Sequence, residues 1–184
     1  MRVIAGKYRS RPLRSLRGLD VRPTTDRLRE TLFNVLAPAV QDSVWLDLYA
    51  GTGAVGIEAL SRGARMLYFV EASRKAAAVI RQNLRSLRIE EGYEVLEREA
   101  EPALRLLDSR GVSCDVCFLD PPYRREHDYA RVLEFLAQSR LLKPASVAVA
   151  EHEKHFDPGE KLGALERYRE LRQGDAVLSF YKLR

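Results

Sequence analysis

Short apolar segments alternate with amphipathic helical patterns along most of this 184-residue chain. The apolar segments are 44–49, 66–70, 93–96, 114–119 and 146–151, and the helical patterns cover about 25–37, 55–62, 74–87, 102–107 and 129–139. Strands that alternate regularly with helices predict a doubly wound, mostly parallel α/β sheet with helices on both faces. Two last extended runs, 165–172 and 176–183, are joined by a Gly174-Asp175 turn and predict an antiparallel hairpin at one edge.

Length and composition predict one soluble folding unit. A chain of this size buries roughly 70% of its extended surface, and the composition includes 46% hydrophobic residues. With no internal repeat or linker, we expect a single domain over residues 1–184. The basic N-terminus lacks the apolar segment of a signal peptide, and no apolar run approaches membrane-spanning length. We therefore expect a cytoplasmic protein without a membrane partner.

Two spacings invite a metal or redox interpretation. Cys114 and Cys117 form a C-x-x-C pair, but they fall in an expected strand, where residues three apart point to opposite faces. No second Cys pair completes a zinc site, so we interpret both as small buried hydrophobes. His152 and His155 form an H-x-x-H pair, which we interpret as a polar strand exit. We expect no metal.

The positive charge of the chain is concentrated at its N-terminus. Residues 1–22 hold seven Lys and Arg against one Asp, so this arm carries +6 while the rest of the chain carries −1. Apolar residues and glycines interleave with the cations, which favours short strands or a hairpin. An anionic nucleic-acid backbone is the natural partner of such an arm, although a solvated edge that resists aggregation is the alternative. The candidate RNA-binding residues are Arg2, Lys7, Arg9, Arg11, Arg14 and Arg22.

A glycine-rich turn follows the first core strand and opens a helix. Gly51, Gly53 and Gly56 satisfy G-x-G-x-x-G, a pattern in which glycine permits a tight turn close to a ligand. Glu71 ends the next strand, where an acid is placed to bind ribose hydroxyls. The combination predicts a nucleoside-containing cofactor.

Asp47 distinguishes between two such cofactors. Its carboxylate, at the tip of the strand before the turn, would repel the pyrophosphate of a nicotinamide dinucleotide but attract the ammonium of S-adenosylmethionine. The pattern therefore favours S-adenosylmethionine, unless Asp47 only caps the turn. Glu99, with Ala100 beside it, follows the third strand and is a candidate acceptor for the adenine amino group.

The run Asp120-Pro121-Pro122-Tyr123 comes directly after the fourth core strand. The carboxyl edge of an open α/β sheet is where ligands bind. The lone pair of an exocyclic amino group is delocalised into the base, so it needs acceptors on its N–H bonds to attack a sulfonium methyl group. Asp120 and the carbonyl of Pro121 would supply these acceptors, and Tyr123 would stack on a base that is flipped out or unpaired.

These segments resemble a known family of enzymes. D-L-Y-A-G-T-G-A-V-G and F-L-D-P-P-Y are similar to class I S-adenosylmethionine-dependent amino-methyltransferases. The opening M-R-V-I-A-G-K-Y-R-S-R-P-L and the segment R-P-T-T-D-R-L-R-E-T-L-F-N resemble the bacterial 16S ribosomal RNA guanine-N2 methyltransferases, the RsmD family. The resemblance spans almost the whole chain. Glu99 departs from it, because the family pattern usually has Asp there.

The resemblance implies a seven-stranded Rossmann-like methyltransferase fold and methylation of a guanine amino group in 16S rRNA, in a small-subunit assembly intermediate. It implies that residues 120–123 hold the base and that Asp47, Gly51, Gly53 and Glu71 hold the cofactor. The residues alone leave two alternatives open. One is a DNA adenine-N6 or cytosine-N4 methyltransferase, which the lack of a separate target-recognition segment disfavours. The other is a non-catalytic RNA-binding module.

Overall fold

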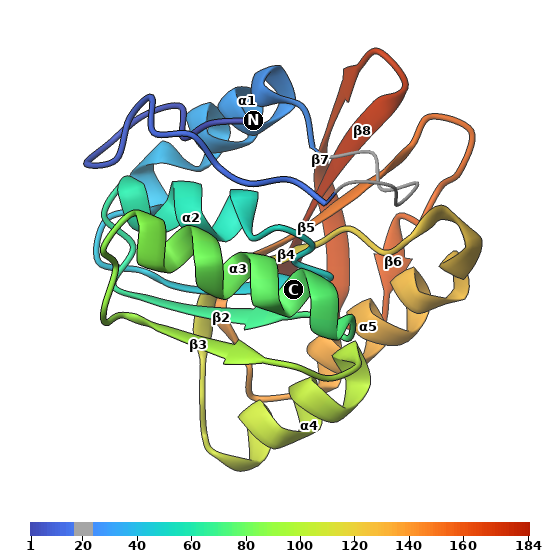
Figure 1. The fold of residues 1–184 in the computed structure, drawn as a ribbon. Helices are drawn as coiled ribbons and strands as arrows, with labels where there is room; N and C mark the ends of the chain where they lie inside the picture. Colours follow the sequence, from blue (N-terminus) through green and yellow to red (C-terminus); the bar gives the residue numbers. More distant parts are fainter. Residues whose placement is uncertain (17–23) are drawn as a thin grey trace.

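The computed structural model describes residues 1–16 and 24–184, and these residues form one sheet with helices on both faces (Figure 1). The strands are β1 Val44–Leu48, β2 Met66–Val70, β3 Tyr93–Leu96, β4 Cys114–Leu119, β5 Leu142–Glu153, β6 Lys161–Leu162, β7 Leu165–Gln173 and β8 Ala176–Leu183. Their order across the sheet is β3-β2-β1-β4-β5-β8-β7-β6. The first five strands in this order are parallel, and the last three pair antiparallel. The predicted doubly wound sheet with its closing hairpin is confirmed, and the two-residue β6 adds an eighth strand to the seven that the resemblance implies.

Two hydrophobic clusters lie on the two faces of the sheet. The helices are α1 Asp26–Leu36, α2 Ala54–Ser61, α3 Arg74–Ser86, α4 Ala100–Ser109 and α5 His127–Gln138, with short 3-10 turns at Ala37–Ala39 and Tyr123–Arg125. Residues of α1, α2, α3 and the N-terminal arm form one cluster, and residues of α4 and α5 form the other. In Figure 1, α2 and α3 lie on one side of the strands and α4 and α5 on the other. The carboxyl ends of β1, β4 and β5 meet between these layers.

Helix α4 begins two residues earlier than the pattern predicted. Pro102 was expected at its first position, but the helix starts at Ala100, and Glu99 is its N-cap with an extended backbone. Proline is tolerated at the third position because the first four N–H groups of a helix have no partner within it. The early start places Glu99 at the beginning of the helix, next to the carboxyl edge of the sheet.

The two cysteines are free and buried, but they do not lie on opposite faces as predicted. Cys114 and Cys117 both belong to the cluster under α4 and α5. The regular alternation fails because the pairing of β4 with β5 shifts between Cys114 and Val116. Burial raises the pKa of the Cys114 thiol to about 12, so it remains a neutral apolar group.

The N-terminal arm folds back on itself and docks on α2. Val3 N–H donates to the carbonyl of Arg11, but the expected strands reduce to a single bridge between Arg2 and Pro12. Side chains of α2 accept hydrogen bonds from the backbone of the arm, as a neighbouring strand would do. The buried carboxylate of Glu58 accepts from the N–H groups of Ile4 (2.7 Å) and Ala5 (3.0 Å). The arm is therefore fixed by its backbone, which leaves its cationic side chains exposed.

Gly6 permits this docking. Its φ is +81°, and a Cβ there would lie 1.9 Å from the carbonyl oxygen of Ser61. We expect Gly6→Ala to destabilise the protein by roughly 1–3 kcal/mol, the usual range for overpacking, and to expose the arm to proteases. Gly111→Ala is the matched control, since Gly111 has φ of +68° and no atom of the described residues within 4 Å of the added Cβ. Equal melting temperatures for the two variants would contradict tight docking at Gly6.

Candidate active site at the carboxyl edge of the sheet

Three acidic side chains come from adjacent strands at this edge. Leu48 pairs with Leu119, and Leu119 pairs with Ala150, so Asp120 and Glu151 follow paired residues on β4 and β5. Asp47 and Asp120 line one cavity of about 240 Å³ together with Gly51 of the glycine turn. The structure therefore brings together the glycine turn and the D-P-P-Y run, which the sequence separates by the whole of α2, α3 and α4.

Asp47 is buried beneath the glycine turn. Only 2% of its surface is exposed, and its Oδ2 accepts from the N–H of Gly56 at 3.0 Å. The pKa of Asp47 is raised from 3.8 to about 7, mainly by burial and also by the charge of Glu71, while the hydrogen bond from Gly56 opposes the rise. Asp47 thus does hold the turn. Its predicted contact with a cofactor ammonium remains a prediction.

The glycines of the turn are required by geometry. Gly53 precedes α2 in the left-handed region at φ +76°. A Cβ on Gly56 would lie 2.2 Å from Leu67 Cδ2 and 2.4 Å from Phe69 Cε1, both on β2. Glycine here lets α2 pack directly on the sheet, and its N-terminus then points toward the cavity.

Glu71 is engaged by the backbone. Its Oε2 accepts from Gly51 N–H and its Oε1 from Ser73 N–H, each at 2.8 Å. Burial raises the pKa of Glu71, although these hydrogen bonds oppose the rise. Each carboxylate oxygen has a second lone pair, so the predicted ribose contact is compatible with these bonds.

Asp120 lies next to the other two acids. Burial raises the pKa of its carboxyl group well above the ordinary range, and the negative charges of Glu151 and then Asp47 add to this effect. Thr24 Oγ1 donates to Glu151 Oε2 at 2.8 Å, whereas Thr25 is the residue that caps α1. Asp120 is therefore held in an electronegative site that favours a positively charged or proton-donating ligand.

The remaining residues of the D-P-P-Y run form the turn after β4. Pro121 is buried and Pro122 is exposed. The Pro122 carbonyl accepts from Arg125 N–H at 2.7 Å, so it serves the turn itself. The roles predicted for the Pro121 carbonyl and for Tyr123 remain predictions, and the Tyr123 side chain lies outside the described part of the structure.

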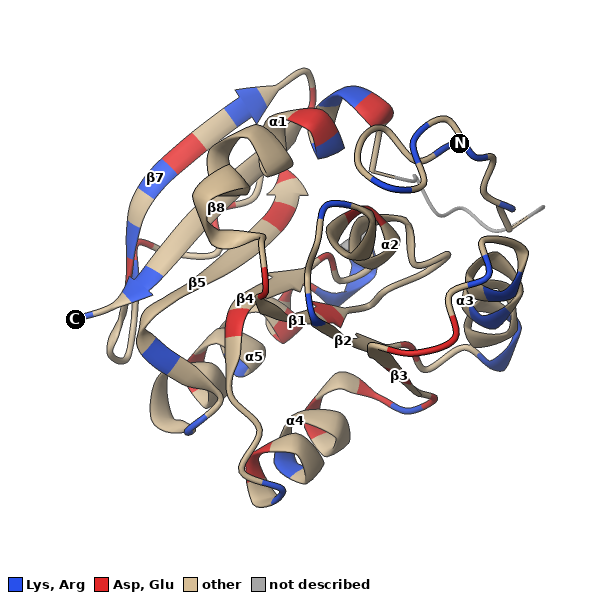
Figure 2. Ribbon diagram, turned by 90° about the vertical axis from the view of Figure 1, so that its left-hand side faces the viewer, with Lys and Arg blue, Asp and Glu red and all other residues tan. Residues whose placement is uncertain are grey.

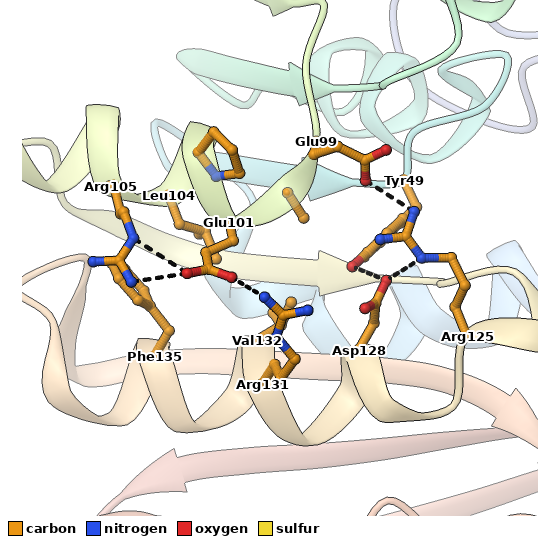
Figure 3. A pocket seen from close by; sticks show the side chains of 12 residues that line it. Tyr49, Glu99, Glu101, Leu104, Arg105, Arg125, Asp128, Arg131, Val132 and Phe135 are labelled. Atoms are coloured by element: carbon orange, nitrogen blue, oxygen red, sulfur yellow. Dashed lines mark hydrogen bonds and ion pairs between the residues drawn. The ribbon is translucent and has the colours of Figure 1, made fainter.

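A second cavity, of about 460 Å³, adjoins the first at Tyr49 (Figure 3). Glu99 and Ala100, the predicted adenine contacts, line this cavity. Glu99 Oε2 accepts from Arg125 Nη1 at 2.8 Å, and Arg125 also pairs with Asp128. The Tyr49 hydroxyl donates to Asp128 Oδ2 at 2.8 Å, so a polar network lines the second cavity and reaches the first at Tyr49. Sequence patterns did not indicate this network.

Cations gather on the arm and on α3 (Figure 2). Helix α3 has Arg74, Lys75, Arg81 and Arg85 and no acidic residue. Arg74 and Lys75, in its first turn, are exposed. A cavity of about 660 Å³ lies between the arm and α1. Its lining includes the cations Arg2, Arg9, Arg27 and Arg62 and the acids Asp26 and Glu30. Of the predicted RNA-binding residues, Arg22 lies outside the described residues.

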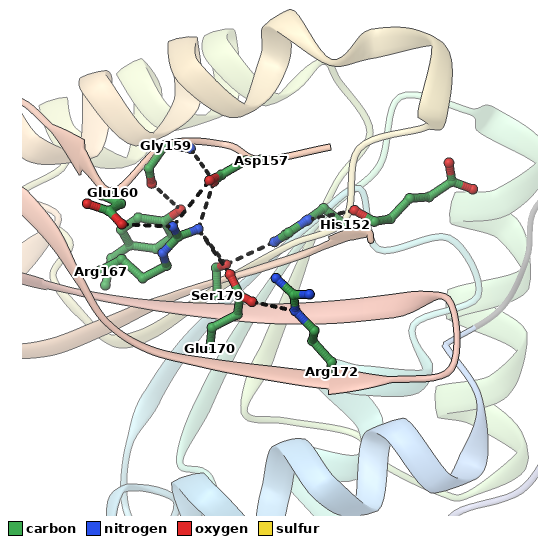
Figure 4. Close-up of polar contacts among 10 residues, drawn as sticks. His152, Asp157, Gly159, Glu160, Arg167, Glu170, Arg172 and Ser179 are labelled. Atoms are coloured by element: carbon green, nitrogen blue, oxygen red, sulfur yellow. Dashed lines mark hydrogen bonds and ion pairs between the residues drawn. The ribbon is translucent and has the colours of Figure 1, made fainter. Parts of the chain in front are cut away.

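Both ring nitrogens of His152 lie within hydrogen-bond distance of protein atoms. Its Nε2 lies 2.9 Å from Ser179 Oγ on β8, and its Nδ1 lies 3.0 Å from the carbonyl of Glu153 (Figure 4). Within residues 1–16 and 24–184, no group of three or more His, Cys, Asp or Glu side chains is arranged to hold a metal ion. In the same residues, no helix is long and apolar enough to cross a bilayer.

Comparison with known proteins agrees with this architecture. A family model described as Conserved hypothetical protein 95 matches residues 1–182. The chain belongs to this family. A putative rRNA methyltransferase of Bacillus subtilis is 35% identical over the full length of both chains. Ribosomal RNA small subunit methyltransferase D of Haemophilus influenzae is 37% identical over 84% of this chain and 79% of that protein.

A solved structure extends the agreement to three dimensions. A putative methyltransferase from Escherichia coli has a TM-score of 0.84 and 33% sequence identity, covering 100% of this chain and 97% of that chain. The RsmD-type family and the methyltransferase fold predicted from the sequence motifs are thereby confirmed. The roles of the individual site residues remain predictions.

Proposed function

We propose that this protein transfers the methyl group of S-adenosylmethionine to the exocyclic N2 amino group of a guanine in 16S rRNA, in a small-subunit assembly intermediate. The observation that carries the proposal is the shared cavity of the glycine turn, Asp47 and Asp120. The relatives named as ribosomal RNA methyltransferases support an rRNA substrate. Guanine as the base rests on the resemblance to the RsmD family.

In this proposal the chain positions the two reactants. Asp47 attracts the methionine ammonium, and the second cavity near Glu99 and Ala100 receives the adenine. When bound, the cofactor supplies an electrophilic methyl group. Asp120 and the Pro121 carbonyl accept the N–H bonds of the target amino group, which stabilises its developing positive charge and aligns the nitrogen with the methyl group.

The test is transfer of labelled methyl from S-adenosylmethionine to small-subunit RNA or particles that lack the modification, followed by nucleoside analysis. We expect the label in N2-methylguanine. Label in N6-methyladenine instead would contradict guanine-N2 as the target. Transfer to the adenine or cytosine of added duplex DNA, with none to the RNA, would favour the DNA-type alternative. Binding of RNA without any transfer would favour a non-catalytic module.

The arm and the cavity between it and α1 are proposed to hold the RNA backbone. If about six phosphates of unpaired RNA are neutralised, a plot of log affinity against log salt should have a slope near −4. Gln substitution of Arg2, Lys7, Arg9, Arg11 and Arg14 should flatten this slope by roughly 3. Arg140→Gln with Lys143→Gln, which removes two exposed cations around the start of β5, is the control. An unchanged slope in the arm variant would contradict the role of the arm.

A further inference from the structure

Asn83 links two segments of the site that are distant in sequence. The residue lies in α3 and is fully buried. Its Oδ1 accepts from Arg14 N–H at 2.8 Å, and its Nδ2 donates to the carbonyls of Arg14 at 3.2 Å and Thr52 at 3.0 Å. Both donors and the acceptor of the amide are thus used. One side chain connects the backbone of the arm to the glycine turn.

The segment held by Asn83 leads directly into the cavity wall. Ser15 and Leu16 follow Arg14, and both line the cavity that contains Asp47 and Asp120. Earlier in the arm, the Arg11 guanidinium donates to the carbonyl of Ser86 at the end of α3. The same stretch of chain therefore carries cations on its outer side and a wall of the candidate cofactor site at its end.

We propose that Asn83 is a positioning residue that couples RNA binding on the arm to cofactor binding at the glycine turn. Its hydrogen bonds to Arg14 keep the next two residues, Ser15 and Leu16, in the wall of the cavity. This inference rests on the proposed function, since it needs both an RNA and a nucleoside cofactor as ligands. RNA that holds the arm in its docked position also stabilises the wall, so the cofactor binds to a site that is already ordered. By linkage, the cofactor increases RNA affinity by the same factor.

The coupling is measured as the ratio of the dissociation constants of S-adenosylhomocysteine without and with saturating unmethylated small-subunit RNA. In the wild-type protein we expect RNA to tighten cofactor binding about 5- to 10-fold, within the usual range of such couplings. In Asn83→Ala the ratio should fall to about 1 to 2 because arm and turn are no longer joined. Gln82→Ala, on the exposed face of the same helix, should keep the wild-type ratio. Loss of folding is checked by thermal melting.

Leu16→Ala tests the wall without altering α3. It should weaken S-adenosylhomocysteine binding and lower the ratio, while RNA still binds the cations of the arm. A wild-type ratio in folded Asn83→Ala, or no change in either quantity in Leu16→Ala, would overturn the inference. A wild-type protein that methylates the RNA but shows a ratio of 1 would overturn the inference alone. A protein that neither binds nor methylates the RNA would overturn the proposed function with it.

Discussion

Asp120→Ala is expected to reduce methyl transfer by a factor on the order of 10² to 10³ while cofactor binding is retained. Removal of one group that stabilises charge in a transition state typically has an effect of this size. Asp120 lies in a cluster with Asp47 and Glu151, and burial and these two charges raise the pKa of its carboxyl group. Its loss removes like-charge repulsion, so the variant should fold at least as well as the wild-type protein.

Single-turnover transfer and equilibrium dialysis with labelled cofactor measure the two effects separately. Asp120→Asn keeps a side-chain carbonyl as an acceptor, and we expect it to lose less activity than Asp120→Ala. If Asp120→Ala instead abolished cofactor binding with little effect on folding, the assignment of Asp120 to the target amino group would be wrong.

Asp47→Asn should abolish cofactor binding and, at the same time, stabilise the protein without ligand. The folded state raises the pKa of Asp47 from 3.8 to about 7. Between these two pH values the folded protein binds a proton that the unfolded chain has released, so stability falls as the pH rises through this window. The cost of ionising the buried carboxylate reaches about 4 kcal/mol above pH 7. Asparagine avoids this cost and keeps an acceptor for Gly56 N–H.

Urea unfolding at pH 5 and pH 8 measures this effect. The stability difference between Asp47→Asn and the wild-type protein should be larger at pH 8. Asp42→Asn, at an exposed position, is the control. Cofactor affinity of the wild-type protein should rise with pH through about 7, because only the ionised carboxylate attracts an ammonium. A stability difference that does not change with pH would contradict the buried state of Asp47.

The order of elements was predictable because its signals are local. The periodicity of 74–87, the glycines after β1 and the turn at Gly174 each arise from residues close together in sequence, and the structure confirms their elements. The start of α4 was mispredicted because proline is compatible with several positions in the first turn. The faces of the two cysteines were mispredicted because a shift in strand pairing has no local signature. That residues 1–184 form one domain remains a prediction.

The sequence predicted the two motifs of the candidate site but not the residues that connect them in space. Asp47 lies near the end of β1 and Asp120 directly follows β4. Parallel strands bring their carboxyl ends to one edge, so the meeting of these residues followed from the fold class. The network of Tyr49, Asp128 and Arg125 had no comparable signal. Asn83 falls on the apolar face of α3, which indicates a polar partner at that position. The sequence pattern does not identify that partner.

The sequence by itself determined the α/β architecture and the position of the glycine turn after β1, since these depend on residue types at short spacing. The chemistry of the carboxylate before the two prolines remains a prediction from the same local pattern. Only the tertiary structure decided where the arm lies, because its backbone bonds go to Glu58 and Asn83, whose side chains are brought to it by the packing of α2 and α3. Hydrogen bonds between residues so far apart in sequence depend on which polar groups are buried together and on how donor and acceptor are oriented. No local sequence pattern encodes either property. The same packing makes the arm both a cationic surface and a wall of the candidate site.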